Sequence, residues 1–118
     1  MVGARLLELM QAGVGAGECA GTGVARGRAS HPVCGDEVHL SLRTDGDRVV
    51  ELRWRAQGCP ATVAVAALAA KVLPGAARAA AEQLLARAVE THGGLVPAER
   101  HALSLVQRAL AAALAETP

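Results

Sequence analysis

Two stretches of alternating apolar and polar residues, joined by a short turn sequence, constrain the fold of this chain most strongly. Apolar residues occupy every second position in residues 38–42 and again in residues 50–56. A period of two residues is typical of a strand that buries one face. The residues Asp45-Gly46-Asp47 lie between the two stretches. The sequence therefore predicts an antiparallel hairpin with a three-residue loop, in which Gly46 takes the positive-φ position.

The alternation also predicts which residues of the two strands face each other. Matching apolar side chains across the hairpin gives three facing pairs: Leu42 with Val50, Leu40 with Leu52, and Val38 with Trp54. The same register places Asp36 opposite Ala56. It also places Cys34 opposite Gly58, one residue before Cys59. Because facing residues lie roughly 4.5–5.5 Å apart, we expect both thiols and the carboxylate at one end of the hairpin, where one metal ion could span them.

The rest of the chain predicts helices that pack on this hairpin. A short amphipathic helix is expected in residues 1–12, and Pro60 fits the first position of a helix that runs to about Leu73. A second helix is expected at about residues 76–91, with Leu84 and Leu85 facing inward. Another begins at Pro97 and carries an apolar stripe, formed by Leu103, Val106, Leu110 and Leu114.

These elements predict an α+β fold, in which a small antiparallel β-sheet with the hairpin at its core is covered on one face by helices. Residues 1–118 are expected to form a single domain. Within it, residues 33–118 form the core, and residues 1–32 hold the N-terminal helix and a Gly-rich segment. That segment, residues 13–32, is expected to be mobile or loosely folded.

Composition and charge exclude several classes of partner. The net charge is +1, the arginines are scattered, and Trp54 is the only aromatic residue, so we expect no nucleic-acid binding. The longest apolar run, residues 59–70, is too short to span a bilayer, and residues 1–13 lack the pattern of a signal peptide. Three cysteines are an odd number for a disulfide framework. We therefore expect a cytoplasmic protein with free or metal-bound thiols and no membrane partner.

The residue types at the expected end of the hairpin suit metal binding. Cys59 precedes Pro60 at the start of a predicted helix, where the helix dipole favours a thiolate. Alternatively, Cys59 is a small buried hydrophobic residue. Asp36 shares the inward parity of Val38, so its carboxylate needs a cation or hydrogen-bond donors there. An Asx-type cap on the nearby backbone is the alternative for Asp36.

Two cysteines and one aspartate leave a tetrahedral zinc site one ligand short. The other candidate ligands are His101, His31, His39, His92 and Cys19. His39 has the parity of the solvent face, and His92 beside two glycines suits a helix C-terminus. His31 lies three residues before Cys34 and could reach the site, although His-Pro is equally an ordinary turn.

We favour His101 as the fourth ligand, with one structural condition. In a regular helix from Pro97, His101 falls nearly opposite the apolar stripe and faces solvent. It reaches the hairpin only if the first turn of this helix is irregular, or if its ring lies at the edge of the packed face.

Several of these elements together resemble a known family. The stretch His-Pro-Val-Cys-Gly-Asp at residues 31–36, the hairpin, Gly58-Cys59 and the following Ala-rich helix resemble NifU/IscU/SufU-type iron–sulfur cluster assembly scaffolds, over roughly residues 30–117. Such proteins build a labile cluster or hold zinc at a site formed by a first Cys, an Asp two residues on, a second Cys, and a late Cys often preceded by His. The resemblance implies a ligand set for zinc or a transient [2Fe–2S] cluster: Cys34, Asp36, Cys59 and His101. The late cysteine is replaced by Ala102.

The resemblance also implies a function. The chain would be an iron–sulfur scaffold or a zinc-bound sulfur acceptor that works with a cysteine desulfurase and iron–sulfur acceptor proteins, and would not be a turnover enzyme by itself. In the zinc-bound branch the first cysteine accepts sulfur, which points to Cys34 as the persulfide acceptor. Cys19 could supply the missing thiolate.

Two alternative functions stay open from the sequence. Because Ala102 replaces a ligand, the chain could be a degenerate scaffold-fold protein that acts as a regulatory or protein-binding subunit. It could also be a cysteine hydrolase with Cys34 or Cys59 as nucleophile and His101 as base, although no oxyanion-hole segment is evident.

Overall fold

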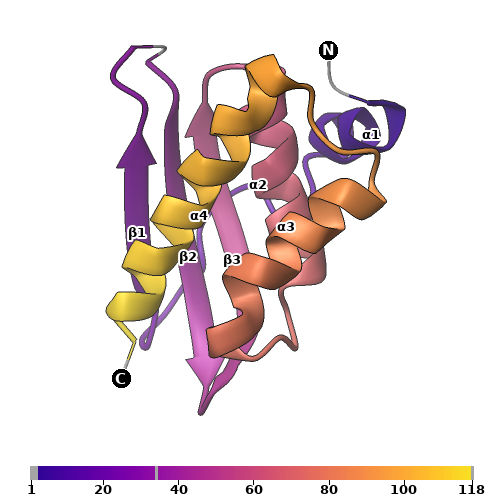
Figure 1. Ribbon diagram of the computed structural model, residues 1–118. Helices are drawn as coiled ribbons and strands as arrows, with labels where there is room; N and C mark the ends of the chain where they lie inside the picture. Colours follow the sequence, from indigo (N-terminus) through magenta and orange to yellow (C-terminus); the bar gives the residue numbers. More distant parts are fainter. Residues whose placement is uncertain (1–2, 34, 118) are drawn as a thin grey trace.

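The computed structural model describes residues 3–33 and 35–117, and its centre is a three-stranded antiparallel sheet (Figure 1). The strands are β1 (Ala25–Ser30), β2 (Glu37–Asp45) and β3 (Arg48–Gln57), in the order β1-β2-β3. Helices α2 (Pro60–Val72) and α4 (Arg100–Ala115) pack on one face of the sheet, and α1 (Ala4–Ala12) and α3 (Ala81–Thr91) pack against α2. Short 3-10 turns, Arg78–Ala80 and Pro97–Glu99, precede α3 and α4. The predicted α+β fold is confirmed.

The core lies between the sheet and the helices and is built from aliphatic and small side chains. Inward residues of β2 and β3 pack against the Ala-rich α2 and against α4; they include Val38, Leu40, Leu42, Leu52 and Trp54. The helix α4 lies so close to β1 that a Cβ atom at Gly27 would stand 2.1 Å from the carbonyl oxygen of Ala109. Glycine is therefore required at position 27 because no side chain fits between β1 and α4.

The hairpin is present, but its predicted register and loop are wrong. Leu42 faces Leu52, Leu40 faces Trp54 and Val38 faces Ala56, a shift of two residues along β3. The loop has only two residues, because Asp45 faces Arg48, and Gly46 takes its first position at a φ of 62°. The register then shifts beyond Thr44, which faces Val49, and leaves Val50 as the extra residue of a β-bulge. Val49 is buried, whereas Val50 is 51% exposed.

The Gly-rich segment is more ordered than the sequence indicates. Residues 25–30 form β1, so the sheet has an edge strand beyond the predicted hairpin. Further upstream, the N–H of Gly17 donates to the carbonyl of Trp54 at 2.8 Å, so the segment also runs along β3. Cys19 is buried, and its N–H donates to the hydroxyl of Ser41 at 2.8 Å. The prediction of a mobile or loosely folded segment over residues 13–32 is therefore wrong for these parts.

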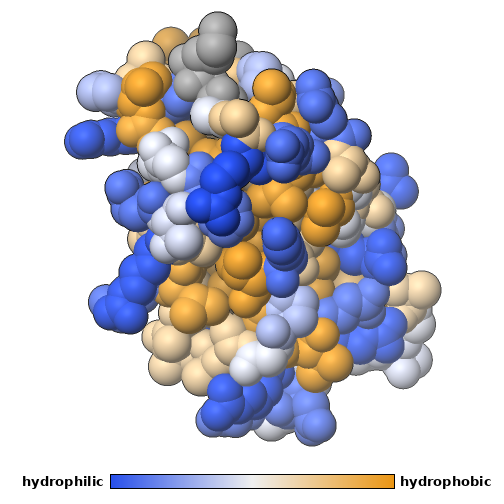
Figure 2. Space-filling model, turned by 90° about the vertical axis from the view of Figure 1, so that its right-hand side faces the viewer, coloured by the Kyte–Doolittle hydropathy of each residue, from blue (hydrophilic) through white to orange (hydrophobic). Residues whose placement is uncertain are grey.

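The helices lie where the sequence predicts them, but two of their faces differ. Leu84 is 36% exposed rather than inward, while Leu85 is buried. Figure 2 views the side that carries α1 and α3, where hydrophobic side chains reach the surface between hydrophilic ones.

In α4 the buried residues are Ala102, Leu105, Val106, Ala109, Leu110 and Ala113. This face is rotated from the predicted stripe because alanines pack against the sheet and leave Leu103 and Leu114 half-buried.

No helix in residues 3–33 and 35–117 has the length and apolar character needed to cross a membrane.

Candidate metal centre

Three side chains predicted as ligands meet at one end of the sheet. Asp36 immediately precedes β2, Cys59 is the N-cap residue of α2, and His101 lies in the first turn of α4. One ligand atom from each lies within 4.8 Å of the other two. The Nε2 atom of His101 is 3.3 Å from Oδ2 of Asp36 and 3.5 Å from Sγ of Cys59. At this end, the top of Figure 1, β3 ends and both α2 and α4 begin.

The carboxylate of Asp36 is the most buried of the three groups, with 3% exposure. Its Oδ1 accepts the backbone N–H of Cys59 at 3.3 Å, and its Oδ2 accepts the hydroxyl of Thr62 at 2.8 Å. Burial raises the pKa of the Asp36 carboxyl, but the hydrogen bonds from Thr62, Cys59 and His101 lower it by more than burial raises it. The net pKa is below the ordinary value. Asp36 is therefore held as a carboxylate, and it satisfies an N–H group at the start of α2.

Cys59 directs its sulfur toward the other donors instead of capping its own helix. Its backbone is extended, Pro60 takes the first helical position as predicted, and the side chain makes no capping hydrogen bond. Sγ lies 3.4 Å from the hydroxyl oxygen of Thr62 and 3.5 Å from Nε2 of His101. Cys59 is half-buried and borders a pocket.

Thr62 is a residue of this site that the sequence analysis missed. It is fully buried, and its hydroxyl lies between the carboxylate of Asp36 and the sulfur of Cys59. A residue at the third helical position points back toward the start of its helix. A threonine three residues after a candidate ligand at the N-cap was the signal that could have identified it.

His101 reaches the site because both structural conditions set out for it hold. The turn before α4, Pro97–Glu99, is a 3-10 helix, and the buried face of α4 is rotated toward His101, whose ring lies at its edge. Nδ1 of His101 lies 3.1 Å from the carbonyl oxygen of Ala98. Because a carbonyl oxygen can only accept, Nδ1 carries a proton. Nε2 then faces Asp36 and Cys59: in the doubly protonated ring it donates to the carboxylate, and in the neutral ring its lone pair can bind a metal ion.

The other candidate ligands lie in different places. His31 is close by, with its ring centroid 5.4 Å from that of His101 in an edge-to-face arrangement, and its backbone N–H donates to the carbonyl of Asp36. His39 is exposed on the sheet face away from the helices, and His92 is at the end of α3, with Nδ1 2.8 Å from the carbonyl oxygen of Ala88. Cys19 packs against Ser41, which shares the strand parity of His39.

Cys34 lies outside the described residues. Its predicted nearness to Cys59 therefore stays a prediction.

The donor set of Asp36, Cys59 and His101 fits a metal ion chemically and by spacing. Thiolate, imidazole nitrogen and carboxylate oxygen are ligands that zinc accepts at about 2.0–2.3 Å, which places neighbouring ligands of a tetrahedral ion roughly 3.3–3.7 Å apart. The two distances from Nε2, 3.3 and 3.5 Å, fall in this range. Cys59 and His101 also border a mainly apolar pocket, which is lined further by Leu7, Pro60, Ala61, Ala98 and Glu99.

The fold and the site together define a class: an α+β domain with a candidate Cys-Asp-His metal centre where the sheet meets the N-termini of two helices. A family model described as the NifU-like N terminal domain matches residues 4–117. The chain therefore belongs to the NifU-like N-terminal domain family, as the motif resemblance predicts.

Relatives by sequence include proteins named for cluster assembly. Over 112 residues the chain is 37% identical to the bifunctional protein NifU/MnmA of Rubrobacter xylanophilus, covering 92% of this chain and 22% of the relative. Over 91 residues it is 28% identical to the iron–sulfur cluster assembly scaffold protein IscU 1 of Archaeoglobus fulgidus, covering 76% of this chain and 60% of the relative. The chain thus spans only part of each of these relatives.

Solved structures show the same fold. A SufU protein of Fervidobacterium islandicum, described as a candidate iron–sulfur cluster assembly scaffold for the SUF system, has a TM-score of 0.79 at 18% identity, with 96% of each chain covered. The N-terminal domain of a NifU-like protein from Brucella abortus has a TM-score of 0.65 at 18% identity, with 97% of this chain and 90% of that chain covered.

Proposed function

We propose that this chain acts in iron–sulfur cluster assembly, as a scaffold or as a zinc-bound sulfur acceptor that receives persulfide sulfur from a cysteine desulfurase. The observation that carries the proposal is the convergence of Asp36, Cys59 and His101, whose ligand atoms lie within 4.8 Å of one another. Membership of the NifU-like family and the names of the relatives support it.

The proposed ligands are Cys34, Asp36, Cys59 and His101, and their cargo is zinc or a transient [2Fe–2S] cluster. Ala102 is fully buried and supplies no ligand, so a histidine and an aspartate accompany the thiolates. Histidine ligates iron in some [2Fe–2S] centres, which makes this set compatible with a cluster as well as with zinc. Cys34 is the proposed persulfide acceptor. A bound metal ion would keep the coordinating thiols deprotonated.

The proposed partners are a cysteine desulfurase and iron–sulfur acceptor proteins in the cytoplasm, with the chain acting as a carrier and not as a turnover enzyme. Cys19 and Cys59 are free thiols, which suits a reducing compartment. The intact group of Asp36, Cys59 and His101 favours this function over that of a regulatory subunit without cluster chemistry.

The arrangement of His101 argues against a cysteine hydrolase. In a catalytic triad the acidic residue binds one ring nitrogen of the histidine, and the nucleophile binds the other. Here Asp36 and Cys59 both face Nε2, and Nδ1 is bonded to the carbonyl of Ala98. This arrangement resembles two metal ligands more than an acid and a nucleophile on either side of a base.

The proposal is tested by anaerobic reconstitution of the purified chain with ferrous iron, cysteine and a catalytic amount of cysteine desulfurase, in parallel with zinc. Iron, acid-labile sulfide, zinc and persulfide are then measured per chain. We expect either a cluster with visible absorption or a zinc-bound chain that carries persulfide, with both lost in Cys59→Ala and retained in Cys19→Ala. A folded wild-type chain with no metal, cluster or persulfide under any of these conditions would refute the proposal.

A further inference from the structure

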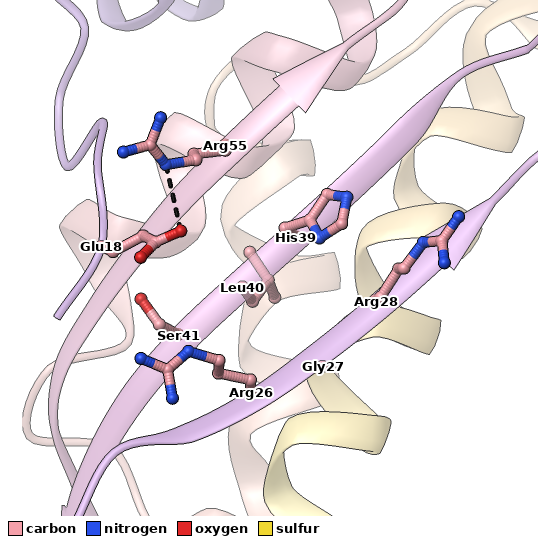
Figure 3. A pocket seen from close by; sticks show the side chains of 8 residues that line it. All are labelled: Glu18, Arg26, Gly27, Arg28, His39, Leu40, Ser41 and Arg55. Atoms are coloured by element: carbon pink, nitrogen blue, oxygen red, sulfur yellow. Dashed lines mark ion pairs between the residues drawn. The ribbon is translucent and has the colours of Figure 1, made fainter. Parts of the chain in front are cut away.

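The face of the sheet that points away from the helices carries four arginines on its two outer strands. Figure 3 draws Arg26, Arg28 and Arg55 of this set. Arg26 and Arg28 are on β1, and Arg53 and Arg55 are on β3. His39 and Ser41 of β2 lie between them. We call these six residues the arginine patch. Arg28 and Arg55 have side chains 64% and 65% exposed, and Arg53 is 44% exposed.

The strand register sets the patch out in two rows. Arg28 faces His39, which faces Arg55. The second row runs from Arg26 through Ser41 to Arg53. Neighbouring strands lie about 4.8 Å apart, and residues two apart on one strand lie about 6.6 Å apart. The four guanidinium groups therefore start from the corners of a rectangle of roughly 10 by 7 Å.

Three of the four arginines are held in place by glutamates, each through the same atom. Nε binds a carboxylate in the pairs Arg28–Glu37 at 3.1 Å, Arg53–Glu51 at 2.8 Å and Arg55–Glu18 at 3.2 Å. Within residues 3–33 and 35–117, the terminal nitrogens of these arginines make no hydrogen bond. An incoming carboxylate can therefore bind the two terminal nitrogens of each guanidinium group without displacing the glutamate on Nε. Because the glutamates already orient these groups, less conformational entropy is lost on binding.

The patch also carries excess positive charge. With the neighbouring Arg43, the face has five arginines against three glutamates: Glu18, Glu37 and Glu51. Arg26 makes no ion pair in the described part of the chain. This local excess of two charges exceeds the net charge of +1 for the whole chain.

We propose that the arginine patch docks an acidic segment of a partner protein through carboxylate–guanidinium contacts. A nucleic-acid partner is disfavoured because Trp54, the only aromatic residue in the sequence, is buried with the inward parity of Leu52, so the patch offers no aromatic side chain on which bases could stack. The apolar pocket beside Cys59 and His101 is lined by helical residues, so a protein on this sheet face leaves that pocket uncovered.

The test titrates the isotope-labelled full chain with hexaglutamate and follows backbone amide shifts by NMR at low and physiological salt. We expect shift changes confined to β1, β2 and β3 at the patch, and affinity that falls with salt. Arg26→Glu combined with Arg55→Glu should weaken binding at least about tenfold. The control, Lys71→Glu with Arg87→Glu, makes the same change in net charge at exposed helical sites and should leave binding within about twofold of wild type.

Inorganic phosphate and oligothymidylate are titrated in parallel at equal ionic strength. Binding of either one as tightly as hexaglutamate would overturn the assignment to an acidic protein segment. Equal weakening by the helical control would overturn the location. If Arg26→Glu with Arg55→Glu fails to fold, Arg26→Gln with Arg55→Gln removes the charges and keeps polar side chains. That variant should also lose most of the binding, and unchanged binding would refute the proposal.

Discussion

The backbone of Gly58 lies in contact with the carboxylate of Asp36: a Cβ atom at position 58 would stand 2.3 Å from Oδ1 and 2.4 Å from Cγ of that side chain. This contact joins the start of β2 to the connection between β3 and α2. It holds the carboxylate where it can accept the N–H of Cys59 and face His101. The geometry of the candidate metal centre therefore depends on the absence of a side chain at residue 58.

Replacement of Gly58 by alanine should damage the site and the fold together. Gly58 has a φ of 139°, which strains any other residue, and the new Cβ would displace Asp36. We expect a loss of about 1–3 kcal/mol in the free energy of unfolding and at least partial loss of zinc binding. Gly93→Ala is the matched control, because its φ is 104° but nothing lies within 4 Å of the added Cβ. Equal effects of the two variants on zinc binding would contradict the proposed contact.

Thr62 should matter through its hydroxyl group and not through its volume. Thr62→Val keeps the shape but leaves an oxygen of the buried carboxylate of Asp36 without its closest donor. We expect urea unfolding to show a cost of about 1–3 kcal/mol. The matched change Thr91→Val removes a hydroxyl that bonds the carbonyl of Arg87 on the exposed face of α3 and should cost far less. Similar costs for the two variants would show that the hydrogen bond to Asp36 is unimportant.

Asp36 should make stability fall in acid. Because its pKa in the folded chain is below the ordinary value of 3.8, the unfolded chain takes up a proton at this group first as the pH falls. The contribution of the ionised Asp36 to the free energy of unfolding is fully present above about pH 3.8. It is lost as the pH falls through the lower pKa of the folded state. Urea unfolding of wild type and Asp36→Asn over this range measures it. The stability difference between them should shrink in acid, and a constant difference would contradict the lowered pKa.

The two described cysteines should differ in reactivity. Burial raises the pKa of the Cys19 thiol above its ordinary value of 9.0 despite a hydrogen bond with Ser41, and the residue as a whole is 3% exposed. Cys59 is half-buried beside a pocket. In the native, metal-free chain, iodoacetamide labelling followed by peptide mass spectrometry should modify Cys19 more slowly than Cys59, by at least on the order of tenfold. Labelling at equal rates in the folded chain would show that Cys19 is not buried.

The parity of the strands was predictable from the sequence, but their register was not. Alternation fixes which face a side chain occupies, and Leu40, Leu42, Leu52 and Trp54 are buried as expected. The bulge at Val50 and the two-residue loop shift the pairing by two residues, which preserves the faces. Alternation alone predicts that Val50 faces inward, whereas the bulge leaves it exposed.

The alternation of apolar and polar residues did not predict the edge strand β1, because its inward residues are small. Ala25, Gly27 and Ala29 face α4, where close packing excludes larger side chains, and a Gly-Ala pattern has no strand propensity. The buried face of α4 was predicted at the wrong angle for the same reason, because the buried alanines 102, 109 and 113 contribute little to the hydrophobic pattern of the sequence. That rotation is what brings His101 to Asp36 and Cys59, so the sequence suggested this ligand but could not place it.

Cobalt substitution of the apo chain, with binding and optical absorption measured together, tests whether Asp36, Cys59 and His101 hold one metal ion. We expect one ion per chain in tetrahedral coordination with a sulfur-to-cobalt charge-transfer band. Cys59→Ala should change that band, and Asp36→Asn and His101→Ala should each weaken binding at least about tenfold. His92→Ala, which removes a histidine at the end of α3, should leave binding and the spectrum unchanged. A chain that binds no cobalt, or binds it equally in all these variants, would contradict the claim that Asp36, Cys59 and His101 hold one metal ion.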